Sequence, residues 1–162
     1  MSENSLSVSD ADLRKLVLFK SAEFDDVSDV LKECSVLRVA AGRIVVAAGQ
    51  ENSRIYLVLN GTLSVRLEGP ESPPVAQIGK GEMFGEMSVI DGGETSAFVV
   101  TETECHIVGL NGDNLWELLR RTPYVAHNLL KLMAQRLRNA NSVIEQLRQE
   151  AAGDDFDIEP GG

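Results

Sequence analysis

The sequence has little of several features that would point to particular functions: basic charge, aromatic residues, cysteine and long apolar runs. Lys and Arg number 15 against 25 Asp and Glu, which gives a net charge of -10. Binding to nucleic acid needs a basic face, so we expect no nucleic-acid partner. Aromatic residues make up only 5% of the chain, which at 162 residues is long enough for one hydrophobic core.

The cysteines and histidines form no pattern typical of a metal site. Cys34 and Cys105 are far apart and belong to no CxxC motif, and His106 and His127 are not spaced like metal ligands. We therefore expect two free thiols in or near the core and no metal site.

Segments for export or membrane insertion are also missing. No apolar run approaches the ~20 residues that a membrane span needs, and the polar N-terminus lacks the apolar region of a signal peptide. These absences predict a cytoplasmic protein without a membrane partner.

The middle of the chain has the pattern of a β-protein. Short runs rich in Val, Ile and Leu alternate with glycines, which predicts an all-β sandwich or barrel with strands in residues 35–40, 43–48, 54–60, 62–68, 75–79, 96–101 and 105–110. Asn60-Gly61 lies between two of these runs and is typical of a type I′ hairpin turn.

Helical periodicity flanks this region, over residues 10–32 before it and over residues 110–121 and 123–150 after it. Thr122-Pro123 supplies an N-cap and a first helical residue for the last helix. We expect a flexible N-terminus (1–10), one domain (11–150) and a disordered acidic tail (151–162). The tail either keeps the protein soluble or docks a partner.

A glycine-rich segment, residues 79–93, interrupts the strand pattern and is the candidate binding site. Gly85 precedes a short helix predicted for residues 86–90. A glycine there lets a ligand approach the backbone closely, and the first amides of a helix favour an anion. The alternative is that the segment is a structural turn that binds nothing.

Four motifs in order extend this interpretation: AGRIVV (41–46), IYLVLNG (55–61), GEMFGEMSVI (81–90) and TSA (95–97). Together they resemble the cyclic-nucleotide-binding domain family, and most of all the sensor domain of its bacterial cyclic-AMP receptor members, over residues 12–150. The resemblance implies a mainly β fold with flanking α-helices: a jelly-roll-like β-roll, N-terminal helices and a long C-terminal helix. It also implies a phosphate-binding cassette, here residues 81–97.

The resemblance assigns roles within the cassette. Gly85 is the close-approach glycine, Glu86 binds the ribose 2′-hydroxyl, and Met87 and Ser88 supply amides to the phosphate. These roles make chemical sense, because a carboxylate accepts a hydrogen bond from a hydroxyl and repels a phosphate.

One departure from the family concerns the phosphate. The position of the family's phosphate-binding arginine holds Thr95, so the hydroxyls of Thr95 and of its neighbour Ser96 remain, with the amides, as the candidate ligand-binding groups there. Loss of a charge-assisted bond weakens binding by about ten- to a hundredfold, since such a bond contributes roughly 1.5–3 kcal/mol. The departure leaves open that no nucleotide binds at all.

The last helix carries an apolar row with steps of three and four residues, typical of a coiled-coil seam: Leu130, Met133, Leu137, Ala140, Ile144 and Leu147. We expect a homodimer through this helix, the alternative being that the row covers the protein's own barrel. By resemblance to the family's dimer helix, Asn141 falls where adenine is contacted. It is otherwise a solvated helix residue.

The sequence thus predicts a stand-alone, non-catalytic module that senses cyclic AMP or a related nucleotide and signals to an unidentified protein partner. No catalytic triad, metal cluster or P-loop points to an enzyme, and no cofactor is expected. The alternative function is a ligand-independent dimeric adaptor with a degenerate pocket.

Overall fold

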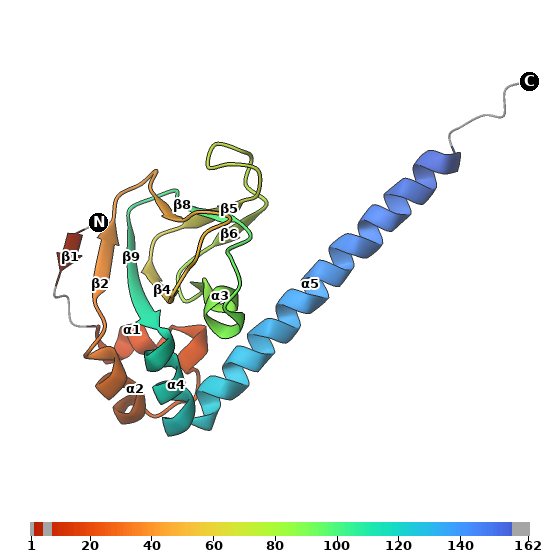
Figure 1. Ribbon diagram of the computed structural model, residues 1–162. Coiled ribbons are helices and arrows are strands. Elements are labelled where there is room, and N and C mark those ends of the chain that lie inside the picture. Colours follow the sequence, from red (N-terminus) through yellow and green to blue (C-terminus); the bar gives the residue numbers. More distant parts are fainter. Residues whose placement is uncertain (1, 5–7, 157–162) are drawn as a thin grey trace, which may run out of the picture. The chain divides into compact units, whose positions relative to one another are not determined.

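Two antiparallel sheets curl around one core and form a β-roll (Figure 1). The protein is represented by a computed structural model that describes residues 2–4 and 8–156. The larger sheet has the strand order β1 (Ser2–Asn4), β2 (Val36–Val39), β9 (Cys105–Asn111), β4 (Arg54–Asn60) and β7 (Met83–Phe84). The smaller sheet has the order β3 (Ile44–Val46), β8 (Phe98–Thr101), β5 (Leu63–Arg66) and β6 (Ala76–Ile78). The predicted β-roll is confirmed, while β7 was not expected as a strand.

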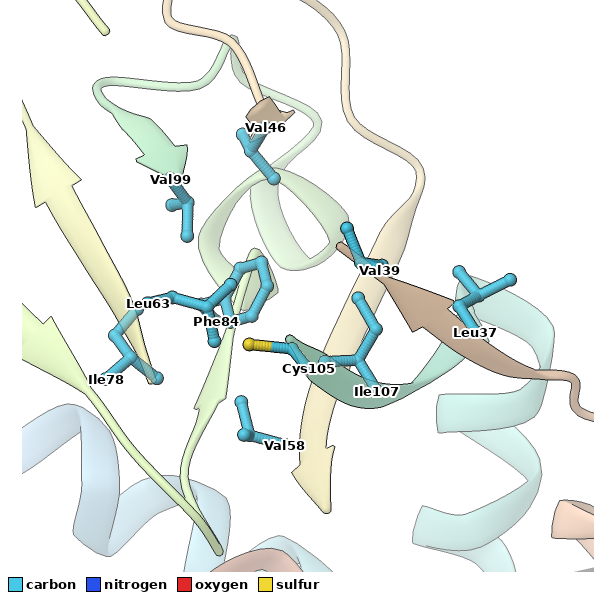
Figure 2. Close-up of a cluster of buried hydrophobic side chains, with 10 residues drawn as sticks. All are labelled: Leu37, Val39, Val46, Val58, Leu63, Ile78, Phe84, Val99, Cys105 and Ile107. Atoms are coloured by element: carbon cyan, nitrogen blue, oxygen red, sulfur yellow. The ribbon is translucent and has the colours of Figure 1, made fainter. Parts of the chain in front are cut away.

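The core of the roll is built from the inward-facing residues of both sheets, which Figure 2 shows meeting around Phe84 and Cys105. Cross-strand neighbours fix the register, as where Leu57 of β4 lies opposite both Val108 of β9 and Met83 of β7. Because side chains alternate along a strand, Val58 faces this core and Leu57 the opposite side of the sheet. Both residues are buried, so both faces of β4 are covered.

The hairpin predicted at Asn60-Gly61 is wrong. Strands β4 and β5 on either side of it belong to different sheets and do not pair. A type I′ turn needs a positive φ at both central residues, but among the described residues Ser21 is the sole non-glycine with one. Gly61 instead permits a close approach, since a Cβ there would lie 2.6 Å from Cys105 Sγ. The turn carries the chain from one sheet to the other.

The N-terminal region differs from its predicted plan. Residues 2–4 pair with β2, whereas we expected residues 1–10 to be flexible; residues 1 and 5–7 lie outside the described part. The helical stretch predicted for residues 10–32 divides into α1 (Asp10–Arg14), the 3-10 helix η1 (Val17–Phe19) and α2 (Phe24–Leu31). Ser21, with a φ of 66°, takes a left-handed conformation that no α-helix accommodates.

Two helices follow β9. Helix α4 (Gly112–Arg121) starts with a capping box, in which Asn111 and Asn114 each accept a hydrogen bond from the other's backbone N–H. Figure 1 shows α1, α2 and α4 gathered at one end of the roll. Helix α5 (Pro123–Phe156) begins at the predicted proline but runs six residues beyond the predicted end at 150. The rest of the predicted disordered tail, residues 157–162, lies outside the described part.

The chain divides into two structural units within α5, residues 1–128 and 129–162. In the first unit, the buried Asn128 side chain donates hydrogen bonds to the carbonyls of Leu18 and Lys20, at 2.9 and 2.8 Å. These bonds attach the first turns of α5 to the N-terminal helices. No helix among the described residues is both long and apolar enough to cross a membrane.

Candidate functional site

The cassette starts from a residue anchored in the core. Phe84 is 3% exposed and stacks on Tyr56 with ring centroids 5.1 Å apart (Figure 2 shows Phe84 within the core cluster). Burial raises the pKa of Tyr56 above its ordinary value of 10.0. Because β7 pairs with β4 at Phe84, the residue that follows is fixed in space relative to the sheet.

Gly85 is required at its position for two reasons. Its φ of 84° lies in the left-handed region, and a Cβ would lie 2.7 Å from the Arg54 carbonyl oxygen and 2.8 Å from Asn52 Nδ2. The Asn52 side chain donates to both the Arg54 and the Gly85 carbonyls, at 2.8 and 3.1 Å. Asn52 was not predicted as a site residue.

The short helix predicted for residues 86–90 is confirmed as α3 (Glu86–Asp91). It begins after Gly85 and ends at Gly92, which has a φ of 71° and donates to the Ser88 carbonyl at 2.9 Å. Asp91 accepts a further bond from the Gly93 N–H at 2.8 Å. The local sequence therefore sets both ends of the helix.

The predicted site residues of α3 divide by burial. Glu86 is 1% exposed, and Ser88 is also buried, while Met87 is 59% exposed. A buried carboxylate therefore follows directly after Gly85, at the first residue of α3.

Thr95 lies against the β3–β4 loop (residues 47–53). Its hydroxyl donates to the Ala47 carbonyl and accepts from the Gln50 N–H at 3.2 Å, and its own N–H donates to the Gln50 carbonyl at 3.0 Å. Thr95 is 9% exposed, whereas its neighbour Ser96 is exposed. The structure thus brings Gly85 and Thr95 to the same loop, and Thr95 already has protein partners there.

Asn141 lies on α5 in the second unit, residues 129–162, with an exposed side chain. Its contact with a purine stays a prediction.

The thiols are not activated: burial raises the pKa of Cys34 from 9.0 to about 11, and burial also raises the pKa of Cys105. Across residues 2–4 and 8–156, no group of three or more His, Cys, Asp or Glu side chains is arranged to hold a metal ion.

The chain is similar to known proteins in sequence and in fold. The sequence matches the family described as "Cyclic nucleotide-binding domain" over residues 36–122. The cyclic AMP receptor protein of Thermus thermophilus is 38% identical over 115 residues, which cover 68% of this chain and 52% of that protein. A CRP-like cAMP-activated global transcriptional regulator of Mycobacterium tuberculosis is 26% identical over 137 residues, covering 83% of this chain and 61% of the relative.

Among solved structures, the catabolite activator protein of Thermus thermophilus superposes with a TM-score of 0.73 at 33% identity. The match covers 82% of this chain and 63% of that one. The chain therefore spans about half to three fifths of the length of these relatives.

Proposed function

The chain belongs to the cyclic nucleotide-binding domain family, and from this premise we propose that it is a non-catalytic regulatory module that senses cyclic AMP or a related cyclic nucleotide at its cassette. The observation that carries the proposal is the pair Gly85 and Glu86: a left-handed glycine beside the core, followed by a buried carboxylate. By family resemblance this carboxylate accepts the ribose 2′-hydroxyl.

The affinity is expected to be modest, because position 95 lacks the family's arginine. A missing charge-assisted bond lowers affinity by about ten- to a hundredfold. We therefore expect weak binding, so the assay should cover micromolar to millimolar nucleotide concentrations.

Isothermal titration with cyclic AMP, cyclic GMP and 2′-deoxy cyclic AMP tests the proposal on the wild type and on Glu86→Gln. The wild type should bind cyclic AMP more tightly than the 2′-deoxy analogue, since only the former offers the hydroxyl to Glu86. In Glu86→Gln this difference should shrink, because a neutral amide is a weaker acceptor than a carboxylate. Absence of heat and of a thermal shift at millimolar nucleotide would remove the sensor function and favour a ligand-independent adaptor.

We propose further that α5 forms a homodimer. Along this helix Leu130, Leu137, Ile144 and Leu147 are 70%, 66%, 55% and 58% exposed in the single chain. They follow one seam over about 25 Å at 1.5 Å per residue, and such an exposed apolar row associates in water. Sedimentation over a wide range of protein concentration should give the mass of two chains.

In this proposal the nucleotide acts by changing the surface that the dimer offers to a protein partner in the cytoplasm. A ligand shifts such an equilibrium only by its difference in affinity for the two states. Hydrogen exchange of α5 with and without cyclic AMP measures that shift. Identical exchange in both conditions, with the cassette saturated, would contradict a signalling role.

A further inference from the structure

The sequence Val-Ala-Ala-Gly occurs twice, at residues 39–42 and 46–49, and each copy forms a turn held by a threonine from or just before β8. In the first turn, the Thr101 hydroxyl donates to the Ala40 carbonyl at 2.7 Å and accepts from the Arg43 N–H at 2.9 Å. The Thr101 backbone accepts from Gly42 at 2.7 Å and donates to Arg43 at 2.9 Å. We call this turn the framework turn.

The second turn repeats these four bonds with Thr95, and we call it the cassette turn. Ala47 takes the place of Ala40, Gln50 that of Arg43, and the Gly49 N–H donates to the Thr95 carbonyl at 2.8 Å. Gly42 and Gly49 have nearly equal φ angles, 77° and 74°. The hydroxyl at position 95 thus has the same structural task as the one at position 101.

The two turns differ in what else they touch. Beyond the cassette turn, the same loop reaches Asn52, whose side chain donates to the Gly85 carbonyl at 3.1 Å. The β3–β4 loop is therefore bonded to the residue before α3 through Asn52 and to a residue after α3 through Thr95. The framework turn has neither bond.

The residues of the β3–β4 loop (47–53) are all exposed or half-buried, and the loop is hydrogen-bonded to Thr95 and Gly85. A cavity of about 250 Å³ is lined by Gln50 and Asn52 of the loop together with Val46, Tyr56 and Thr95. We therefore expect the loss of these hydrogen bonds to loosen the loop.

We infer that Asn52 and Thr95 are positioning residues for the nucleotide site, which they set through the β3–β4 loop without touching the ligand. In a planar trans peptide the C=O and the following N–H point in opposite directions. The bond from Asn52 to the Gly85 carbonyl therefore directs the Glu86 N–H away from the loop. Thr95 fixes the loop that carries Asn52. This inference rests on the proposed function.

Four variants test it: Thr95→Val, Thr95→Ser, Asn52→Asp and, as matched control, Thr101→Val. Thr95→Val and Thr101→Val remove the same two hydroxyl bonds, so both should lower the melting temperature by several degrees. We expect only Thr95→Val to weaken cyclic AMP binding, by about tenfold. Thr95→Ser keeps the hydroxyl and should restore the affinity. Asn52→Asp keeps the shape but cannot donate to Gly85, and should weaken binding at least as much.

A second measurement needs no ligand. Amide exchange of residues 85–91 in the free protein should accelerate by about tenfold in Thr95→Val and Asn52→Asp and stay unchanged in Thr101→Val. If all three variants lose equal affinity, or if exchange at 85–91 does not respond to positions 52 and 95, the inference is overturned. If the wild type binds no nucleotide while exchange responds as described, the positioning inference stands and the proposed function fails.

Discussion

The β-roll and the C-terminal helix differ in the burial of their apolar residues. Ile107, Val58 and Leu63 in the roll are completely buried, while Leu130 and Leu137 of α5 are 70% and 66% exposed. The roll therefore buries these apolar residues within one chain. On α5 the apolar row of Leu130, Leu137, Ile144 and Leu147 is exposed in the single chain, and we propose that a second chain covers it. The contrast therefore separates a core that is packed within one chain from a row that the proposed dimer would bury.

The largest effect is expected from truncating a side chain in the core of the roll. Ile107→Ala should lower the free energy of unfolding by about 2–5 kcal/mol, because it leaves a cavity among fully packed side chains. The loss should be the same at every protein concentration in urea titrations monitored by circular dichroism. A cost below about 1 kcal/mol would mean that the core relaxes around the cavity.

A charge in the apolar row of α5 should change the mass of the assembly and leave the fold of each chain intact. Leu137→Lys places a charge in the seam and should convert the dimer into monomers with the roll intact. Ser142→Lys, on the opposite side of the helix, is the control. Sedimentation measures the mass, and the melting temperature should lose its dependence on protein concentration only in Leu137→Lys. Equal behaviour of the two variants would exclude the seam as the interface.

The next prediction compares the two glycines at the ends of α3. Gly85 and Gly92 both have a positive φ, but a Cβ at Gly85 meets backbone whereas one at Gly92 meets open space. Gly92→Ala should cost roughly 1 kcal/mol of stability, and Gly85→Ala more, about 1–3 kcal/mol with loss of nucleotide binding. Thermal unfolding and titration with cyclic AMP separate the two. Normal binding by Gly85→Ala would refute the close-approach role.

Restoring the family's cation has a smaller expected effect. Thr95→Arg and Thr95→Val both lose the hydroxyl bonds to the β3–β4 loop, but only the arginine brings a charge to the nucleotide phosphate. We therefore expect Thr95→Arg to bind cyclic AMP about ten- to a hundredfold more tightly than Thr95→Val. Equal affinities in isothermal titration would show that side chains at position 95 do not reach the phosphate.

The smallest effect concerns acid stability on the outside of the roll. The Ser64 hydroxyl and then Arg66, at 2.7 Å, hold the pKa of Glu102 below its ordinary value of 4.5. A depressed carboxylate pKa stabilises the fold above about pH 4.5, and this contribution disappears as the pH falls through the folded value. Glu102→Gln should therefore flatten the acid limb of a pH–melting curve. The exposed Glu51→Gln is the control, and identical curves for both would contradict the assignment.

Strands β2 to β6, β8, β9 and helix α3 could be predicted because their signals are local, whereas β1 and β7 were missed. Runs such as residues 54–60 carry β-branched and apolar residues between glycines, and α3 lies between Gly85 and Gly92, which start and stop it. The prediction of a hairpin at Asn60-Gly61 failed because the same dipeptide also suits a connection between two sheets, where Gly61 must pass close to Cys105. A local pattern does not distinguish the two.

The part of the site that escaped prediction depends on contacts distant in sequence. Asn52 lies 33 positions from Gly85, and Thr95 lies 45 from Gln50. The repeated Val-Ala-Ala-Gly is visible in the sequence and could have indicated two equivalent turns, but it does not name the threonines that hold them. Family resemblance placed Thr95 in the binding site, which stays a prediction, but it could not show that the Thr95 hydroxyl bonds backbone groups of the β3–β4 loop.

The dependence of the cassette on one carboxamide has a chemical consequence. Asn52 precedes Ser53 in a loop, a setting in which an asparagine side chain slowly loses ammonia to form a cyclic imide, which water then opens to isoaspartate and aspartate. The aspartate product is identical to Asn52→Asp, and both products carry a carboxylate in place of the carboxamide, so an acceptor replaces the donor that bonds the two carbonyls. Stored protein would thus lose sensitivity with age while remaining folded, so the age of a preparation belongs among the variables of any binding measurement.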